Sequence, residues 1–120
     1  MNHHILFVDD DIPMRETLSH LFKKKGFAVT TAPNVTEAKR LAEVVPATLF
    51  ILDVGLGNDN GLDLLVFFKE KYPKIPVIMF TGLGGDEAVN NDAMIKGASA
   101  CLCKTDSLND LLKEVQRLAS

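Results

Sequence analysis

Three short apolar runs in this chain end directly in charged side chains. They are residues 5–8 before Asp9, residues 49–52 before Asp53, and residues 101–103 before Lys104. An unbroken apolar run of this length is typical of a parallel strand that is buried on both faces. Open sheets of such strands carry their functional groups at the carboxyl ends of the strands. The sequence therefore predicts that these three charged side chains share one edge of a sheet.

Strand-like and helix-like patterns alternate along the chain. Strands are expected at about residues 4–8, 27–31, 48–53, 75–80 and 99–103, and helices at about 12–25, 35–45, 61–72, 86–96 and 107–119. Five β/α repeats predict an α/β fold with helices on both faces of a parallel sheet. Asp9 and Asp53 can meet only if the first and third strands are neighbours, as in the doubly wound, flavodoxin-like order 2-1-3-4-5. We expect a three-layer (βα)5 sandwich that forms a single domain over residues 1–120.

Composition argues against several classes of protein. With 16 acidic and 13 basic residues the net charge is -3, which does not favour a nucleic-acid or membrane surface. No basic flank or cleavage site precedes the first strand, and no apolar run reaches the ~20 residues of a membrane helix. Cys101 and Cys103 are two residues apart on a predicted strand, a spacing that suits a disulfide poorly. We therefore expect a cytoplasmic, reducing location.

The predicted edge holds groups that suit phosphoryl chemistry. Several carboxylates within a few ångströms repel one another unless a cation binds or a pKa rises. Oxygen ligands of this kind suit a hard ion, namely Mg²⁺. Lys104 adds a positive charge, and Thr81 adds a hydroxyl at the end of the fourth predicted strand. Together these groups form a cradle for a phosphoryl group carried by one carboxylate.

The ordered motifs resemble the receiver domain of two-component response regulators over residues 5–118. The motifs are Asp9-Asp10 after the first strand, Asp53 with Gly61 eight residues later, Thr81 after the fourth strand, and Gly97-Ala98 followed by Lys104. The resemblance implies that a sensor histidine kinase or phosphotransfer protein phosphorylates Asp53. It implies that Asp10, Asp53 and the backbone carbonyl of Gly55 hold Mg²⁺, with Asp9 acting largely through water.

The same resemblance implies a signalling switch rather than an enzyme that acts on other molecules. Lys104 would pair with Asp53 and then with a phosphoryl oxygen, while Thr81 would move inward to bond another. The domain would catalyse only its own phosphorylation and dephosphorylation. The change would alter the surface of the fourth helix, fifth strand and fifth helix, which an effector domain, a downstream protein or a second copy of the chain would read.

Four features depart from the usual receiver pattern. Cys101 occupies a position that usually holds tyrosine or phenylalanine, and Thr105 replaces a proline, which makes a cis peptide bond at that point improbable. Gly57 also replaces a proline, so the loop after Asp53 is predicted to be loose. The glycine-rich loop over residues 81–86 is one residue longer than usual and is predicted to be mobile.

Two other functions remain open from the sequence. A degenerate receiver could act as an interaction module that does not depend on phosphorylation, which the substitutions at Cys101 and Thr105 would favour. A small phosphohydrolase could use an aspartyl phosphate, but such enzymes place a second aspartate where this chain has Gly55. Simpler roles also exist for single residues: Asp11 as a helix cap, Lys104 as a solvated lysine, and the cysteines as packing residues.

Overall fold

One sheet of five parallel strands forms the centre of the protein. The computed structural model describes residues 3–82 and 86–119. The strands of the sheet are β1 (His4–Val8), β2 (Ala28–Ala32), β3 (Leu49–Leu52), β6 (Val77–Thr81) and β7 (Ala100–Cys103). Their spatial order is β2-β1-β3-β6-β7, all parallel, which confirms the predicted order 2-1-3-4-5.

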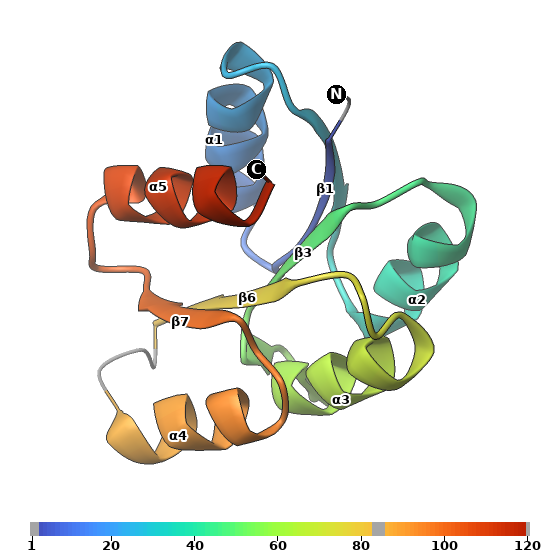
Figure 1. Ribbon diagram of the computed structural model, residues 1–120, viewed down its shortest axis with the longest axis vertical. Helices are drawn as coiled ribbons and strands as arrows, with labels where there is room; N and C mark the ends of the chain where they lie inside the picture. Colours follow the sequence, from blue (N-terminus) through green and yellow to red (C-terminus); the bar gives the residue numbers. More distant parts are fainter. Residues whose placement is uncertain (1–2, 83–85, 120) are drawn as a thin grey trace.

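Helices cover both faces of this sheet, as Figure 1 shows. The helices α1 (Ile12–Lys24) and α5 (Leu108–Ala119) lie on one face, and α2 (Val35–Val44), α3 (Gly61–Lys71) and α4 (Glu87–Ile95) lie on the other. Successive strand residues point to opposite faces, so Ile5 and Phe7 pack with α1 and α5, whereas Leu6 and Val8 pack in the other core. The predicted three-layer sandwich is confirmed.

Polar side chains fix where the helices begin. Asn34 accepts a hydrogen bond from the Glu37 amide at 2.9 Å at the start of α2, and Asn60 accepts from the Leu62 amide at 2.8 Å at the start of α3. Asp11 caps α1, whose first turn contains Pro13. These side chains satisfy amide groups that have no partner inside a helix. Of these helices, α1 begins close to the end of β1, the strand that Asp9 follows.

The segment after Asp53 differs from its prediction. In place of a loose loop, Gly55–Leu56 (β4) and Asp59–Asn60 (β5) pair as a short antiparallel hairpin. Gly57 lies at its tip with φ of 65°, a conformation that favours glycine. Leu56 is only 3 % exposed and packs in the core beside α3. Burial of this leucine holds the hairpin against the core. The glycine content of the segment did not indicate this contact.

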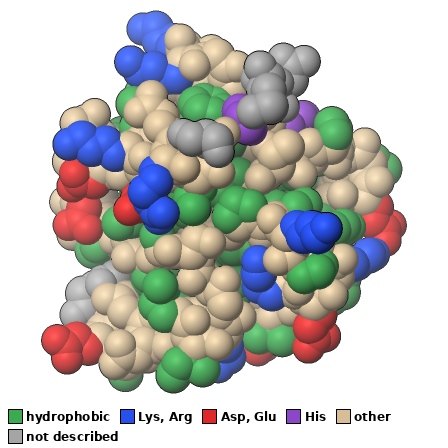
Figure 2. Space-filling model, in the orientation of Figure 1, with side chains coloured by type: hydrophobic (Ala, Val, Ile, Leu, Met, Phe, Trp, Pro, Cys, Tyr) green, Lys and Arg blue, Asp and Glu red, His purple; other side chains and the backbone are tan. Residues whose placement is uncertain are grey.

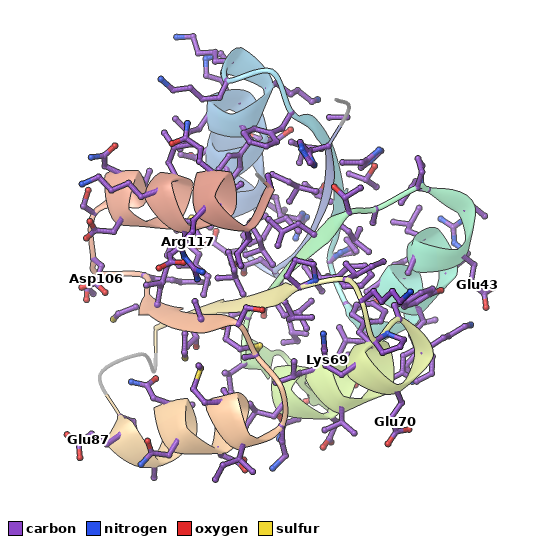
Figure 3. The ribbon with its side chains drawn as sticks, in the orientation of Figure 1. Glu43, Lys69, Glu70, Glu87, Asp106 and Arg117 are labelled. Atoms are coloured by element: carbon purple, nitrogen blue, oxygen red, sulfur yellow. The ribbon has the colours of Figure 1, made fainter. Side chains whose placement is uncertain are left out.

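A lysine on α3 organises the entry to β6. Lys69, labelled in Figure 3, donates hydrogen bonds from Nζ to the carbonyls of Pro73 (3.1 Å) and Ile75 (3.0 Å). The strand begins at Val77, two residues later than predicted, because residues 73–75 form a turn and a bend before it. It also extends one residue further, so that Thr81 belongs to the strand. The predicted threonine is thus held in the sheet.

The surface mixes charges of both signs. On the face in Figure 2, acidic side chains lie mainly near the edges, whereas several basic side chains lie within the face among hydrophobic ones. Among the described residues, no helix combines the length and apolar content that crossing a membrane requires.

Candidate functional site

The predicted site residues lie at the carboxyl ends of four strands. Asp9 follows β1, Asp53 follows β3, Thr81 ends β6, and Lys104 follows β7. Asp9 is completely buried, Asp53 is 5 % exposed and Thr81 is 1 % exposed. Within the described part of the chain these three are the buried polar or charged residues. Polar groups this deeply buried need partners, so the contacts of each one define the site.

Lys104 joins the two buried aspartates. Its amide donates to the Thr81 carbonyl at 2.9 Å, which continues the pairing of β7 with β6 beyond the end of the strand. Its ammonium Nζ lies 2.7 Å from Asp53 Oδ2 and 2.7 Å from Asp9 Oδ2. The turn that follows is closed by Asp106, labelled in Figure 3, whose carboxylate accepts from the Cys103 amide at 3.2 Å. One lysine therefore neutralises part of the charge of both aspartates.

The backbone of Asp53 is fixed on both sides. Its amide donates to the Val8 carbonyl at 3.1 Å, and its Oδ1 accepts from the Gly55 amide at 3.2 Å. The start of α3 approaches so closely that a Cβ atom on Gly61 would lie 1.8 Å from the Asp53 carbonyl oxygen. The Gly61 amide donates to the Val54 carbonyl at 2.7 Å. This packing leaves the Asp53 carboxylate at a defined position on the sheet edge.

Asp10 completes an acidic cluster with Asp9 and Asp53. Each of the three offers a carboxylate oxygen, and these oxygens lie within 4.8 Å of one another. Asp10 is exposed, whereas the other two are buried. Asp9 Oδ1 accepts from the Asp11 amide at 3.0 Å. When all three are ionised, they carry three negative charges, and the ammonium of Lys104 offsets one of them.

Burial and pairing act in opposite directions on the titration of this cluster. Burial raises the pKa of Asp9, although hydrogen bonds from Lys104 and from the Asp11 amide lower it in part. Burial also disfavours the charged form of Lys104, but hydrogen bonds to Asp53 and Asp9 outweigh it and raise the pKa of the lysine. The lysine therefore stays charged, and burial penalises the ionised form of Asp9.

The donor set fits a hard divalent cation. Asp9 Oδ2 is buried, and its partner among the described residues is the ammonium of Lys104, which it shares with Asp53. An oxygen in this condition gains most from a cation nearby. The remaining ligands are carboxylates, and exposed Asp10 leaves access for metal-bound water. Asp9, Asp10 and Asp53 can together hold such an ion.

For the remaining predicted site residues, the contacts in the structure do not establish the predicted roles. Gly55 lies in β4, exposed, with its amide directed to Asp53, and the metal-binding role of its carbonyl stays a prediction. The inward movement of the Thr81 hydroxyl also stays a prediction. The peptide bond before Thr105 is trans, as predicted, because the described residues contain no cis peptide bond. The loop predicted to be mobile includes residues 83–85, which lie outside the described residues.

Both cysteines lie on β7. Cys101 packs against the core on the side of α2, α3 and α4, and its Sγ donates to Asn90 Oδ1 on α4 at 3.0 Å. Burial raises the pKa of its thiol. Cys103 Sγ lies 2.9 Å from the Thr105 hydroxyl. The position of Cys101 agrees with a packing role, whereas the contact given for Cys103 is polar.

Sequence reasoning missed one residue beside the site. Arg15, one turn into α1, donates from Nη1 to the backbone carbonyl of Asp9 at 2.6 Å. The position is six residues after Asp9, on a helix that begins at the sheet edge. An arginine on the first turns of such a helix is a signal that could have suggested this contact.

Comparisons with known proteins agree on one family. The family model described as the response regulator receiver domain matches residues 5–116. The photosynthetic apparatus regulatory protein RegA of Cereibacter sphaeroides is 33 % identical over 107 residues, which cover 89 % of this chain and 58 % of RegA. The chain thus spans little more than half the length of this curated relative.

Two solved structures share the fold over nearly the whole chain. A response regulator protein from Burkholderia pseudomallei, with a phosphorylated aspartic acid, calcium ion and citrate, is 28 % identical with a TM-score of 0.86, covering 99 % of this chain and 74 % of that one. The chemotaxis protein CheY4 of Vibrio cholerae is 28 % identical with a TM-score of 0.89, covering 98 % of this chain and 99 % of that one.

Proposed function

Because the chain belongs to the receiver-domain family of response regulators, we propose that Asp53 accepts a phosphoryl group from a histidine residue of a partner protein. Receiver domains are phospho-accepting signalling domains of two-component systems rather than enzymes in the usual sense. The observation that carries the proposal is the position of Lys104 Nζ, 2.7 Å from Asp53 Oδ2 beside the acidic cluster. This arrangement supplies a nucleophile, a cation site and a fixed positive charge within one pocket.

Receiver domains bind a divalent metal at an acidic pocket, and here we propose Mg²⁺ as the ion. Asp10 and Asp53 would bind it directly, Asp9 largely through water, and the Gly55 carbonyl would complete the protein ligands. The all-oxygen donor set and the exposed side of Asp10 support this ion, which usually retains several waters. When bound, Mg²⁺ supplies positive charge that stabilises the phosphoryl group during transfer.

We propose that the phosphoryl group moves to Asp53 in a single displacement at phosphorus. An Asp53 oxygen forms a bond to phosphorus while the phosphorus–nitrogen bond of the donor histidine breaks, and that nitrogen keeps the electron pair and later takes a proton. Lys104, already in contact with Asp53, would move its hydrogen bond to a phosphoryl oxygen. Thr81, at the end of β6, would donate its hydroxyl to another. Positioning of this kind accounts for most of the catalysis in phosphoryl transfer.

Catalysis by this domain is proposed to be limited to its own modification. In dephosphorylation, water attacks phosphorus and the phosphorus–oxygen bond to Asp53 breaks, which releases inorganic phosphate and restores the carboxylate. The added negative charge makes new contacts with Lys104 and Thr81, and these differential contacts would shift the population toward an altered surface of α4, β7 and α5.

Response regulators work with histidine kinases and effector domains. For this chain we propose one receiver domain over residues 1–120, a sensor kinase or phosphotransfer protein as donor, and an effector domain or downstream protein as target. Pairing of two copies on activation is also proposed. The mixture of charge signs around the face in Figure 2 gives no support to direct nucleic-acid binding. A cytoplasmic location is proposed as well, because Cys101 and Cys103 lie two residues apart on β7, a spacing that suits a disulfide poorly.

The first experiment measures phosphorylation directly. Purified protein is incubated with acetyl phosphate and Mg²⁺, and intact mass spectrometry is expected to detect one added phosphoryl group. D53N is expected to accept none, because the nucleophilic oxygen is replaced by an amide. Asp59→Asn is the matched control, since Asp59 is an exposed aspartate in the neighbouring hairpin.

Equal phosphorylation of D53N and the wild type would refute the assignment of Asp53. If neither protein accepts phosphate from acetyl phosphate or a histidine donor, the alternative of a phosphorylation-independent interaction module would replace the proposal. The contacts of Lys104 with both aspartates give that alternative no support.

A further inference from the structure

Arg15 makes a contact that no role in phosphoryl transfer requires. Its side chain is partly buried, and Nη1 donates to the backbone carbonyl of Asp9 at 2.6 Å rather than to a carboxylate. Its own amide donates to the Asp11 carbonyl at 3.0 Å, which places the residue in the first turns of α1. A charged donor on a neutral carbonyl forms one of the stronger hydrogen bonds in proteins. The contact therefore fixes the direction in which this carbonyl points.

The Asp9 carbonyl lies where the chain leaves the sheet. The carbonyl before it, from Val8, still accepts from the Asp53 amide at 3.1 Å. Asp9 itself keeps one sheet-like contact, from its amide to the Ala32 carbonyl at 3.1 Å, and its side chain accepts from the Asp11 amide. The Asp9 carbonyl is thus held by Arg15 at the point where the strand ends and the loop to α1 begins.

The peptide unit that contains this carbonyl also contains the amide of Asp10. Because a peptide unit is planar, fixing its oxygen fixes the plane that leads into the Asp10 backbone. Asp10 is exposed, so packing does little to orient it. The two aspartates joined by this peptide unit are members of the acidic cluster.

We infer that Arg15 is a positioning residue that orients Asp9 and Asp10 for a divalent cation by holding the peptide unit between them. The inference rests on the proposed function, in that the acidic cluster must bind the cation. It assigns Arg15 no contact with the metal or with the phosphoryl group.

Orientation and charge predict opposite effects of removing this arginine. The guanidinium is a fixed positive charge near a cation site, and by Coulomb repulsion alone its removal would strengthen cation binding. If Arg15 acts by orientation, its removal weakens binding although the repulsion is relieved. The sign of the change therefore separates the two effects.

The experiment measures Mg²⁺ affinity by calorimetry in the unphosphorylated wild type and in R15M, R15K and the control R40M. Arg40 is an exposed arginine on α2, paired with Glu37, so R40M makes the same change of charge away from the site. R15M is expected to bind Mg²⁺ about tenfold more weakly than the wild type, at the lower end of the losses seen for groups that orient metal ligands. R15K keeps a positive donor and is expected to lie between them, and R40M is expected to match the wild type.

Two metal-free readouts separate positioning from general stability. In EDTA, the urea midpoint of R15M is expected to match that of R40M. The amide resonances of Asp10 and Asp11 are expected to shift or to exchange faster with solvent in R15M, and those of the β2 residues are not. A structural role alone would lower the urea midpoint and affect both sets of amides.

The outcomes distinguish the two levels of inference. If the wild type binds Mg²⁺ and R15M binds equally well or more tightly, the role of Arg15 is refuted while the proposed function stands. If the wild type itself binds no divalent cation, the proposed function fails and the inference fails with it. If R15M does not fold, R15K decides: weaker binding with an unchanged urea midpoint supports the role, and wild-type affinity refutes it.

Discussion

At Asp9, the negative charge that favours cation binding also lowers the stability of the metal-free fold. Its carboxylate is fully buried, and burial raises its pKa despite the nearby ammonium of Lys104. A raised pKa means that the folded protein holds the proton of Asp9 more tightly than the unfolded chain does. Ionisation of Asp9 therefore costs stability in the metal-free protein. The same buried charge is what makes the pocket suitable for a cation.

The substitution Asp9→Asn is expected to stabilise the metal-free protein at neutral pH. The contribution of Asp9 to the free energy of unfolding decreases as the pH rises from 3.8, the unfolded value, through the raised folded pKa, and stays low above it. D9N lacks this titration, so it is expected to be more stable than the wild type at pH 7 by about 0.5–2 kcal/mol and to lose the difference on acidification.

Urea unfolding in EDTA over a series of pH values measures this difference. The control is Asp59→Asn, which removes an exposed carboxylate from the hairpin and is expected to change stability little. A D9N protein that is less stable than the wild type at pH 7 would show that the pairing with Lys104 outweighs the cost of burial.

The elements that bring these residues together could largely be predicted. The order of the strands followed from one requirement, that Asp9 and Asp53 meet, together with the repetition of strands and helices. The hairpin of β4 and β5 could not be predicted in this way, because two-residue strands have no periodicity to detect. Its position depends on the burial of Leu56 beside α3, which is a tertiary contact.

At the scale of elements, the junction of β3 with α3 is expected to tolerate no side chain at Gly61. A Cβ atom there would overlap the Asp53 carbonyl oxygen, which belongs to the backbone and has little room to move. Gly61→Ala is expected to lower the free energy of unfolding by about 3 kcal/mol or more. Chemical denaturation measures the loss, and Gly82→Ala is the control because a Cβ atom there would meet no atom within 4 Å. Equal stability of the two variants would contradict the close packing of α3 on β3.

Across the whole molecule, cation binding is expected to be linked to folding. The three aspartates come from β1 and β3 ends that exist as a cluster only in the folded chain, so the unfolded chain lacks the site. A ligand at 100 times its dissociation constant stabilises the folded state by about 2.7 kcal/mol. Thermal unfolding with Mg²⁺ and then with excess EDTA is expected to show this gain and its reversal.

Asp10→Asn provides the matched variant for that measurement. Asp10 is exposed, so the substitution is expected to leave the metal-free protein nearly unchanged while it removes most of the Mg²⁺ effect. Stabilisation of D10N equal to that of the wild type would place the cation elsewhere on the molecule.

Long side chains mark the limit of what the sequence could predict about the site. The contact of Lys104 with Asp53 was expected, but its equally short contact with Asp9 depends on how the lysine crosses between two strand ends. The place of Arg15 on the first turns of α1 indicates that it lies near the end of β1, but it does not indicate that the side chain bonds the Asp9 carbonyl. Such contacts are set by side-chain conformations in the assembled fold.

The alternation of β1 between two apolar cores has a consequence for insertions and deletions. Losing one residue within 4–8 would exchange the sides of Leu6 and Phe7, yet both would still meet a hydrophobic layer. Hydrophobicity alone therefore distinguishes poorly between the two registers. They are distinguished by how well the side chains fit their core and by the position of the charged residues at the strand end. A shifted strand would move Asp9 away from Asp53. A protein with one residue inserted or deleted here would therefore still fold, but it would lose the arrangement of the site that signalling requires.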